Sequence, residues 1–175
     1  SKLFLEERQE GVTGTVVIAS MEGTRAILVE LQALVAPSHF STSSRRSTGV
    51  DQNRLALLIA VLQRHGSLSL VNEDVFINVV SGLKINETAV DLPIIMAIVS
   101  SLKNLKIAED FVCFGEVGLA GEIRPVRYGI ERITAAIKQG FSKVIVPKGN
   151  VPKKIPKGIE IIGVRRLSEA IEVII

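Results

Sequence analysis

Two adjacent serines, Ser100 and Ser101, are the residues whose type best suits nucleophilic attack. A serine hydroxyl becomes reactive when a neighbouring base takes its proton, and the sequence around this pair offers no such base. His65 follows Arg64 where a helix is predicted to end, so its charged form suits the helix dipole there. His39 lies in a polar stretch with nothing nearby to tune it. We therefore expect the serines to pack a helix against a sheet and the histidines to be structural.

Three carboxylates, Asp91, Glu116 and Glu122, could supply the paired acids of a hydrolase, but helix capping and strand-end hydrogen bonds are the simpler interpretation. The motifs HExxH and GxxxxGK(S/T) do not occur, so we expect no metal site, no nucleotide site and no cofactor in this chain. The single cysteine, Cys113, excludes an internal disulfide and a thiolate zinc centre. It lies in an apolar run, which predicts a buried and unreactive thiol.

The composition indicates one packed domain over residues 1–175. Of these residues 47% are hydrophobic and 22% are charged, a balance typical of a folded globule. The apolar run at residues 92–102 is shorter than the roughly 18 residues that cross a bilayer, so no membrane partner is expected. The sequence starts at Ser1 without a methionine or a signal peptide. We expect a cytoplasmic domain taken from a longer chain.

Positive charge is concentrated near the C-terminus. Residues 143–166 hold seven basic side chains and one acid, a net charge of +6, although the whole chain carries only +3. The remainder is therefore net negative, at −3. A one-sided basic surface favours an anionic partner, and solvated loop lysines are the alternative that the sequence leaves open.

The first third of the chain predicts a hairpin followed by a loop and a helix. Two stretches rich in β-branched and apolar residues, 12–20 and 25–35, lie on either side of Glu22-Gly23-Thr24 and predict two antiparallel strands. Residues 37–49 are polar and predict a flexible loop. Apolar residues then recur at helical spacing over residues 51–66.

Strands and helices alternate from Asp51, which is a suitable N-cap for the first helix. A second helix, continuing to Leu105, begins either at Thr88, in a capping box with Asp91, or at Asp91 itself because Pro93 fits only a first turn. The other predicted elements are strands at 74–80, 111–115, 122–126, 143–147 and 159–164, a helix at 130–139, and a last short helix capped by Ser168. This alternation predicts an α/β protein with a mixed sheet.

Residues 22–35, beginning Glu-Gly-Thr-Arg, are followed in a fixed order by further distinctive segments. These segments are Arg45-Arg46 with Gly49, Gln52-Asn53-Arg54-Leu55, residues 74–80, Lys84-Ile85 with Glu87-Thr88, and Phe114-Gly115-Glu116-Val117-Gly118-Leu119. Together they resemble the bacterial RadA (also called Sms) DNA-repair family, whose signature EGTRPLLVEIQALV is similar to residues 22–35. The resemblance covers essentially the whole chain.

The resemblance implies a C-terminal Lon-protease-like domain with the ribosomal protein S5 domain 2-like fold. In this family the domain follows a four-cysteine zinc finger and a RecA-like ATPase, so zinc, ATP and magnesium are expected in those other domains. Family members resemble ring helicases that use ATP to extend paired DNA by branch migration during recombinational repair. The implied partners are duplex or branched DNA, other copies in a hexameric ring, and recombination proteins.

The Lon resemblance also implies where a catalytic dyad would lie. Counted along the Lon motifs PxxGPSAG and PVGGLKEK, the nucleophile position holds Ala89 and the lysine position holds Ile130. A methyl group and a sec-butyl group can neither attack a carbonyl nor take a proton. We therefore expect a catalytically silent domain. Two alternatives stay open: an ATP-dependent Lon-type serine protease domain, and a module that binds a peptide or protein partner in the former cleft.

Two sets of basic residues are candidates for contacts with DNA phosphates. The first set lies within the family-like segments and is slightly favoured: Arg45, Arg46, Arg54 and Lys84. The second set is denser in charge but less tied to those segments: Lys148, Lys153, Lys154, Lys157, Arg165 and Arg166.

Overall fold

The computed structural model describes residues 5, 12–107 and 111–174. Its strands are β1 (Thr15–Glu22), β2 (Arg25–Pro37), β3 (Arg45–Thr48), β4 (Glu73–Val79), β5 (Phe111–Cys113), β6 (Glu116–Val117), β7 (Ile123–Arg124), β8 (Lys143–Pro147) and β9 (Glu160–Val164). Its helices are α1 (Gln52–His65), α2 (Asp91–Lys103), α3 (Gly129–Lys138) and α4 (Leu167–Ile174), with 3-10 turns η2 (Val80–Gly82), η3 (Thr88–Val90) and η4 (Lys148–Asn150).

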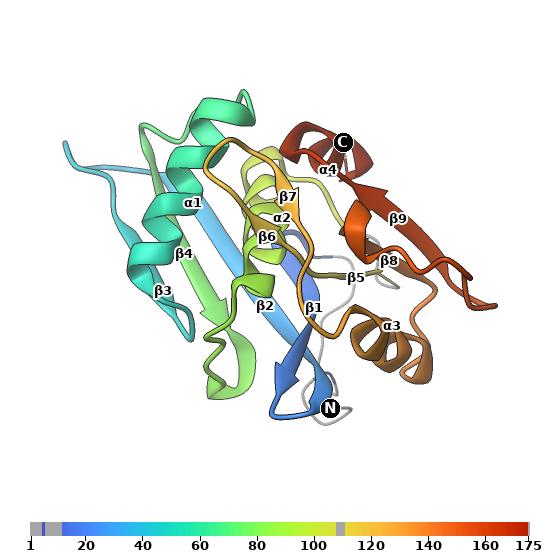
Figure 1. Cartoon of the computed structure of the whole chain (residues 1–175). Coiled ribbons are helices and arrows are strands. Elements are labelled where there is room, and N and C mark those ends of the chain that lie inside the picture. The colour runs from blue at the N-terminus through green and yellow to red at the C-terminus, as the bar shows by residue number, and fades with distance from the viewer. Residues whose placement is uncertain (1–4, 6–11, 108–110, 175) are drawn as a thin grey trace.

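The described residues form a seven-stranded mixed sheet in the order β3-β4-β2-β1-β5-β8-β9, which runs from left to right in Figure 1. β2 pairs antiparallel with β1 and β4, whereas β1, β5, β8 and β9 run parallel to one another. β6 and β7 form a separate antiparallel ribbon. The predicted α/β class and the β1–β2 hairpin are confirmed.

Helices cover both faces of the sheet, and the alternation along β1 decides which side chains meet them. Val16 and Ile18 belong to the core that contains α1 and α2. Val17 and Ala19 belong to a second core with the apolar side of α3. Helix α2 is buried at every position from Asp91 to Ser100, because it lies against the sheet and also contacts α1 and α4. No helix within the described residues is long and apolar enough to span a bilayer.

The prediction of a flexible loop at residues 37–49 is wrong for its last part. Arg45–Thr48 forms β3, which pairs parallel with β4, so that Arg45 lies opposite Val75. The pairing begins where Ser44 N–H donates to Asp74 Oδ1 at 2.7 Å and Val75 N–H donates to Ser44 O at 2.9 Å. These partners lie about 30 residues away in sequence, so the local polar composition did not reveal the strand.

The start of α2 follows the second of the two predictions. Residues 88–90 form the turn η3, α2 begins at Asp91, and Pro93 lies in its first turn. The capping box at Thr88 is wrong, because no side chain caps either helix start and the Asp91 carboxylate bonds to other elements instead. The helix ends at Lys103, where Asn104 adopts the left-handed conformation with φ 54°.

Of two other predicted caps, the N-cap position of Asp51 is confirmed and the cap at Ser168 is wrong. Asp51 occupies the N-cap position of α1, but its side chain makes no capping hydrogen bond. Helix α4 begins at Leu167, so Ser168 lies inside its first turn. The backbone N–H of Leu167 donates to Gly121 O at 2.8 Å, a tertiary bond that fixes where this helix starts.

Candidate functional site

The carboxyl ends of parallel strands meet at one edge of the sheet, which is where α/β sheets usually bind ligands. A cleft of about 340 Å³ lies at this edge, beyond the ends of β1 and β5. We call it the carboxyl-edge cleft; its lining residues are Met21, Glu87, Thr88, Glu116, Pro125, Val126, Arg127, Tyr128 and Arg132.

One wall of the carboxyl-edge cleft is a buried ion pair between Glu87 and Arg132. Glu87 Oε2 accepts from Met21 N–H at 2.6 Å and from Ser20 Oγ at 3.0 Å, while Oε1 bonds to Arg132 Nη2. The Arg132 side chain is only 2% exposed. It also donates to Ala19 O at 2.7 Å, so the guanidinium is enclosed by acceptors.

A second ion pair fixes the other end of the same segment. Asp91 is fully buried and accepts from Arg54 Nε at 2.9 Å, from Arg54 Nη2 and from Val117 N–H at 3.0 Å. Burial raises the pKa of the Asp91 carboxyl, and the bonds from Arg54 and Val117 oppose that rise. The segment from Glu87 to Asp91 is therefore held at both ends by tertiary bonds.

The two residues at the implied dyad positions do not line the carboxyl-edge cleft. Ala89 is 1% exposed and lies in the apolar core with Ala19 and Phe114. Ile130 is 65% exposed and lines a different hollow, of about 390 Å³, together with Arg25. Neither side chain carries a group that can attack or take a proton, and the structure does not place both at one cavity.

The other candidate nucleophiles and bases have structural bonds. Ser100 Oγ accepts from Gly14 N–H at 2.8 Å, and Ser101 Oγ accepts from Val35 N–H at 2.9 Å. His65 Nε2 lies 3.1 Å from the carbonyl oxygen of Leu119. These contacts anchor α1 and α2 to neighbouring segments.

The remaining predicted acids and the thiol also have structural surroundings. The partly exposed carboxylates of Glu116, in β6, and Glu122, just before β7, lie 3.9 Å and 3.1 Å from the Arg124 guanidinium. The hydrogen bonds that Glu122 forms in its own turn lower the pKa of its carboxyl. Cys113 is buried in β5, as predicted, and burial raises the pKa of its thiol well above its usual range. Within the described residues, no three potential metal ligands gather at one place.

The first set of basic residues is partly occupied by bonds within the chain. Arg45 donates from Nη2 to Leu70 O at 2.9 Å and from Nη1 to Glu73 O. Arg54 is held by Asp91. Arg46 on β3 and Lys84 after η2 are the exposed members of this set.

Three members of the second set lie at the carboxyl edge of the sheet, and three lie on the connection that leads to β9. Lys148 follows β8, and Arg165 and Arg166 follow β9, and all three are exposed. The Lys148 side chain packs against β9 at Gly163. The space there is so close that a Cβ atom added to Gly163 would lie 3.0 Å from Lys148 Cδ. The other members, Lys153, Lys154 and Lys157, are exposed on the connection from η4 to β9. Among the residues with a described position, none forms an ion pair or hydrogen bond with these six side chains.

Arg127 and Tyr128 lie at the carboxyl-edge cleft, although neither was among the predicted site residues. Both are exposed, and Tyr128 is the only tyrosine of the chain. The one feature of the sequence that could have pointed to this site is the single tyrosine just before a predicted helix. Its backbone geometry, with φ 65°, could not be read from the residue type.

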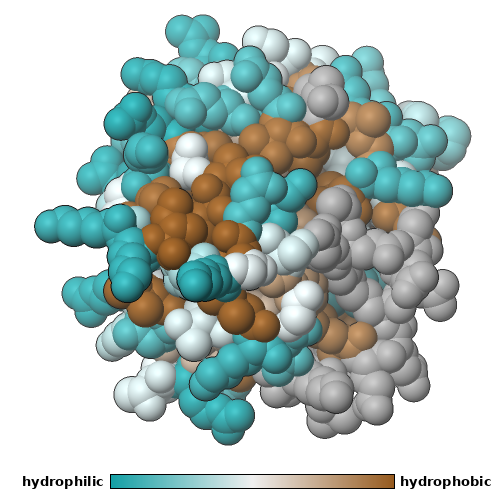
Figure 2. Space-filling view, turned by 90° about the vertical axis from the view of Figure 1, so that its right-hand side faces the viewer, coloured by the Kyte–Doolittle hydropathy of each residue, from teal (hydrophilic) through white to brown (hydrophobic). Residues whose placement is uncertain are grey.

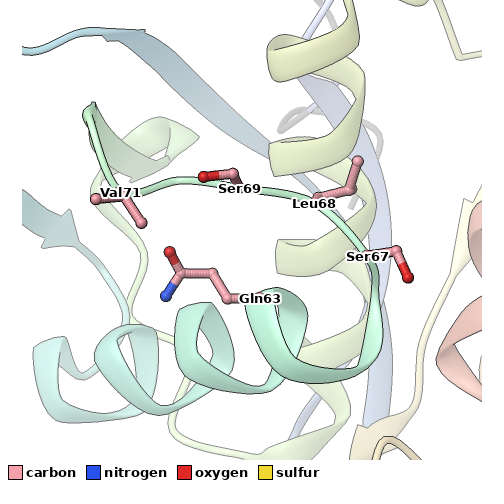
Figure 3. A pocket seen from close by; sticks show the side chains of 5 residues that line it. All are labelled: Gln63, Ser67, Leu68, Ser69 and Val71. Carbon is pink, nitrogen blue, oxygen red and sulfur yellow. The ribbon is translucent and has the colours of Figure 1, made fainter.

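A larger hollow, of about 440 Å³, lies between the end of α1 and the following loop, and Figure 3 shows Gln63 pointing from the helix toward that loop. Gln63 Oε1 accepts from Leu70 N–H at 3.3 Å. The lining residues are Gln63, Ser67, Leu68, Ser69 and Val71, none of which carries a charge. This hollow therefore lacks the charged side chains that acid–base chemistry or an anionic ligand would need.

Comparison with known proteins identifies relatives over nearly the whole chain. A family model described as subunit ChlI of Mg-chelatase matches residues 42–150. The chain is 52% identical over 173 residues to DNA repair protein RadA of Escherichia coli (strain K12) and 51% identical over 172 residues to DNA repair protein RadA of Pseudomonas aeruginosa. It is 45% identical over 172 residues to DNA repair protein RadA of Bacillus subtilis (strain 168).

These alignments cover 98–99% of the present chain but only 38% of each relative. The chain thus corresponds to a little over one third of the length of these curated relatives.

Proposed function

From this chain, which belongs to the family that the ChlI model describes and is a homologue of DNA repair protein RadA, we infer a role in DNA repair. We propose that the chain is a non-proteolytic, DNA-contacting scaffold domain of such a protein. We propose that residues 1–175 form a single Lon-protease-like domain with the ribosomal protein S5 domain 2-like fold. The ATP-dependent motor of branch migration, with its zinc, ATP and magnesium sites, would then lie in other domains of the parent protein.

The observation that carries the DNA-contact proposal is the exposed basic group at the carboxyl edge of the sheet. Lys148, Arg165 and Arg166 follow two adjacent parallel strands, β8 and β9. Long cationic side chains at strand ends reach phosphates without burying their charge. The chain should bind a labelled duplex at low salt, with an affinity that falls steeply as salt rises. No binding at low salt would contradict the proposal.

The scaffold proposal includes assembly into a ring, hexameric in the full-length protein. Figure 2 shows an apolar area on the side of the molecule where the edge strand β9 lies. Ile161 and Ile162 of that strand are half-buried, and Ile155 is 53% exposed. Exposed apolar surface and an open strand edge favour association. Sedimentation of the full-length protein over a concentration range tests this, and a strict monomer throughout would overturn it.

We predict that the chain hydrolyses neither peptides nor ATP. Neither serine nor lysine lines the carboxyl-edge cleft, and no phosphate-binding loop occurs in the sequence. Fluorogenic peptide and ATPase assays should give rates equal to the buffer blank. Turnover above blank that Thr88→Ala or Glu116→Gln abolishes would favour the alternative, a Lon-type serine protease.

We also predict that Ala89→Ser with Ile130→Lys gives no measurable peptidase activity. Ala89 is enclosed in the core and Ile130 faces another hollow, so the introduced hydroxyl and amine would not meet. A working dyad needs supporting residues that hold both groups to about half an ångström. The peptide assay on the double variant, with circular dichroism as a folding control, checks this; activity would show that the two positions converge.

A further inference from the structure

The backbone of Tyr128 adopts a conformation that bulky residues rarely occupy. Its φ is 65° and its ψ is 35°, in the left-handed region. The other described non-glycine residues with positive φ are small and polar: Ser67, Ser81 and Asn104. Strained backbone of this kind persists where the surroundings over-determine it, and it is concentrated at functional sites.

Four hydrogen bonds hold the segment 125–129 that contains this tyrosine. The side-chain amide of Asn150 bonds to both the N–H and the C=O of Val126, each at 2.9 Å. Arg132 donates from Nε to Arg127 O at 2.9 Å and from its backbone N–H to Tyr128 O at 3.0 Å. Arg132 is itself fixed by its ion pair with Glu87. Side chains from two other parts of the chain therefore fix the backbone of this segment.

This segment carries an aromatic ring that is not part of either hydrophobic core. Tyr128 is 48% exposed, and its hydroxyl forms no hydrogen bond with any described residue. It lies at the carboxyl-edge cleft beside the exposed Arg127. Thr88 and Glu116 also line the cleft, where they offer a hydroxyl group and a partly exposed carboxylate; that carboxylate lies 3.9 Å from Arg124 Nε.

We propose that the carboxyl-edge cleft binds an unstacked base of single-stranded DNA. The ring of Tyr128 stacks on the base, and Arg127 contacts the adjoining phosphate. The carboxylate of Glu116 accepts a hydrogen bond from the exocyclic amino group of cytosine or adenine. This inference rests on the proposed DNA contact and adds a second class of DNA to it, since a base inside a duplex is stacked and cannot enter a cavity.

The side chains that line the carboxyl-edge cleft suit a nucleic-acid base better than other ligands. Glu87 is neutralised by Arg132, so the charges left for a ligand are the cation of Arg127 and the acceptor of Glu116. One cation, one acceptor and one aromatic face match one nucleotide. The hollow beside Ile130 has no aromatic side chain in its lining, and the hollow of Figure 3 has no charge.

The composition of the chain supplies a direct probe. It contains one tyrosine and no tryptophan, so emission excited above the phenylalanine band comes from Tyr128 alone. Oligo(dC) should quench this emission saturably, because stacking places the base on the ring. An abasic oligonucleotide of equal length and a matched duplex should leave it unchanged at concentrations where each is bound. Equal quenching by the abasic strand would overturn the proposal.

Variants separate stacking from folding. Tyr128→Gly removes the ring and relieves the positive φ, so its Tm should be equal to or above that of the parent while its affinity for oligo(dC), measured by anisotropy, falls about tenfold. Tyr128→Phe should keep the affinity within about twofold, because the ring remains. Phe40→Ala, at an aromatic side chain that is 78% exposed outside the cleft, is the matched control and should have no effect.

Glu116→Ala should remove the preference for oligo(dC) over oligo(dT), because it takes away the acceptor for the exocyclic amino group that cytosine has and thymine lacks. The result also separates this inference from the proposed duplex contact. If Tyr128→Gly leaves oligo(dC) binding unchanged while removal of the lysine and arginine charges weakens duplex binding, only the base site is wrong. If quenching occurs but those charge changes do nothing, only the duplex contact is wrong.

Discussion

Glu87→Ala is expected to lower the free energy of unfolding by about 3–5 kcal/mol, the cost of leaving a buried charge without its partner. Arg132 is 2% exposed, and its guanidinium is enclosed by Glu87 and by the carbonyl oxygens of Ala19 and Arg127. Glu87 also accepts from Met21 N–H and Ser20 Oγ, so those donors lose a partner as well. Urea denaturation monitored by circular dichroism measures the change.

The reverse truncation should cost less, and the double variant should recover part of the loss. In Arg132→Met the remaining Glu87 is 26% exposed and can be solvated. In Glu87→Ala with Arg132→Met no unpaired charge remains, so this pair should be more stable than Glu87→Ala alone. Glu160→Ala is the control, because Glu160 is 64% exposed and lies 3.9 Å from Lys143; it should change stability by less than about 0.5 kcal/mol. Equal costs for Glu87→Ala and Glu160→Ala would contradict the argument.

Elements set by local pattern were predictable from the sequence. The β1–β2 hairpin follows from two β-rich stretches around Gly23, whose φ of 63° suits a tight turn. Helix α1 follows from apolar residues at helical spacing. Helix α3 stops two residues before Gly140, whose positive φ of 86° suits the end of a helix. In each case the residues that decide the structure are neighbours in sequence.

Elements set by distant partners were not predictable in the same way. β3 depends on β4, and the Asp91 carboxylate, which a capping box would direct back to Thr88, bonds to Arg54 and Val117 instead. The sequence separations are 37 residues for Arg54 and Asp91 and 45 for Glu87 and Arg132. No local pattern signals such a pair, since each member alone resembles a surface charge.

In the candidate site, too, some features were predictable from the sequence and others depend on distant partners. The resemblance located the segments that form the carboxyl-edge cleft, including Glu87-Thr88 and Glu116. It could not show that Arg45 and Arg54 are bonded within the chain, which leaves Arg46 and Lys84 as the exposed members of the first basic set. Side-chain availability depends on tertiary packing, so charge density along the sequence is an incomplete guide to a binding surface.

Replacing Lys148, Arg165 and Arg166 together by glutamine should weaken duplex binding by two orders of magnitude or more near 0.1 M salt. Each phosphate contact contributes about 0.9 to the slope of log K against log salt, so three lost contacts lower the slope by about 2.7. All three side chains are exposed and lie outside the core, so folding should be unaffected. Fluorescence anisotropy with one labelled duplex at several salt concentrations gives both the affinity and the slope.

The chain provides a control with the same change in net charge. Lys153, Lys154 and Lys157 are three equally exposed cations on the connection to β9, away from the strand ends. If a surface at the carboxyl edge binds DNA, glutamine at these positions should change the slope by less than about 1, whereas a purely global charge effect would make the two triple variants equal. Arg46→Gln with Lys84→Gln tests the exposed members of the other set. If only that double variant lowers the slope, the DNA contact lies on β3 and the turn after η2. If none of the three variants changes the affinity or the slope, this domain does not contact DNA through these residues.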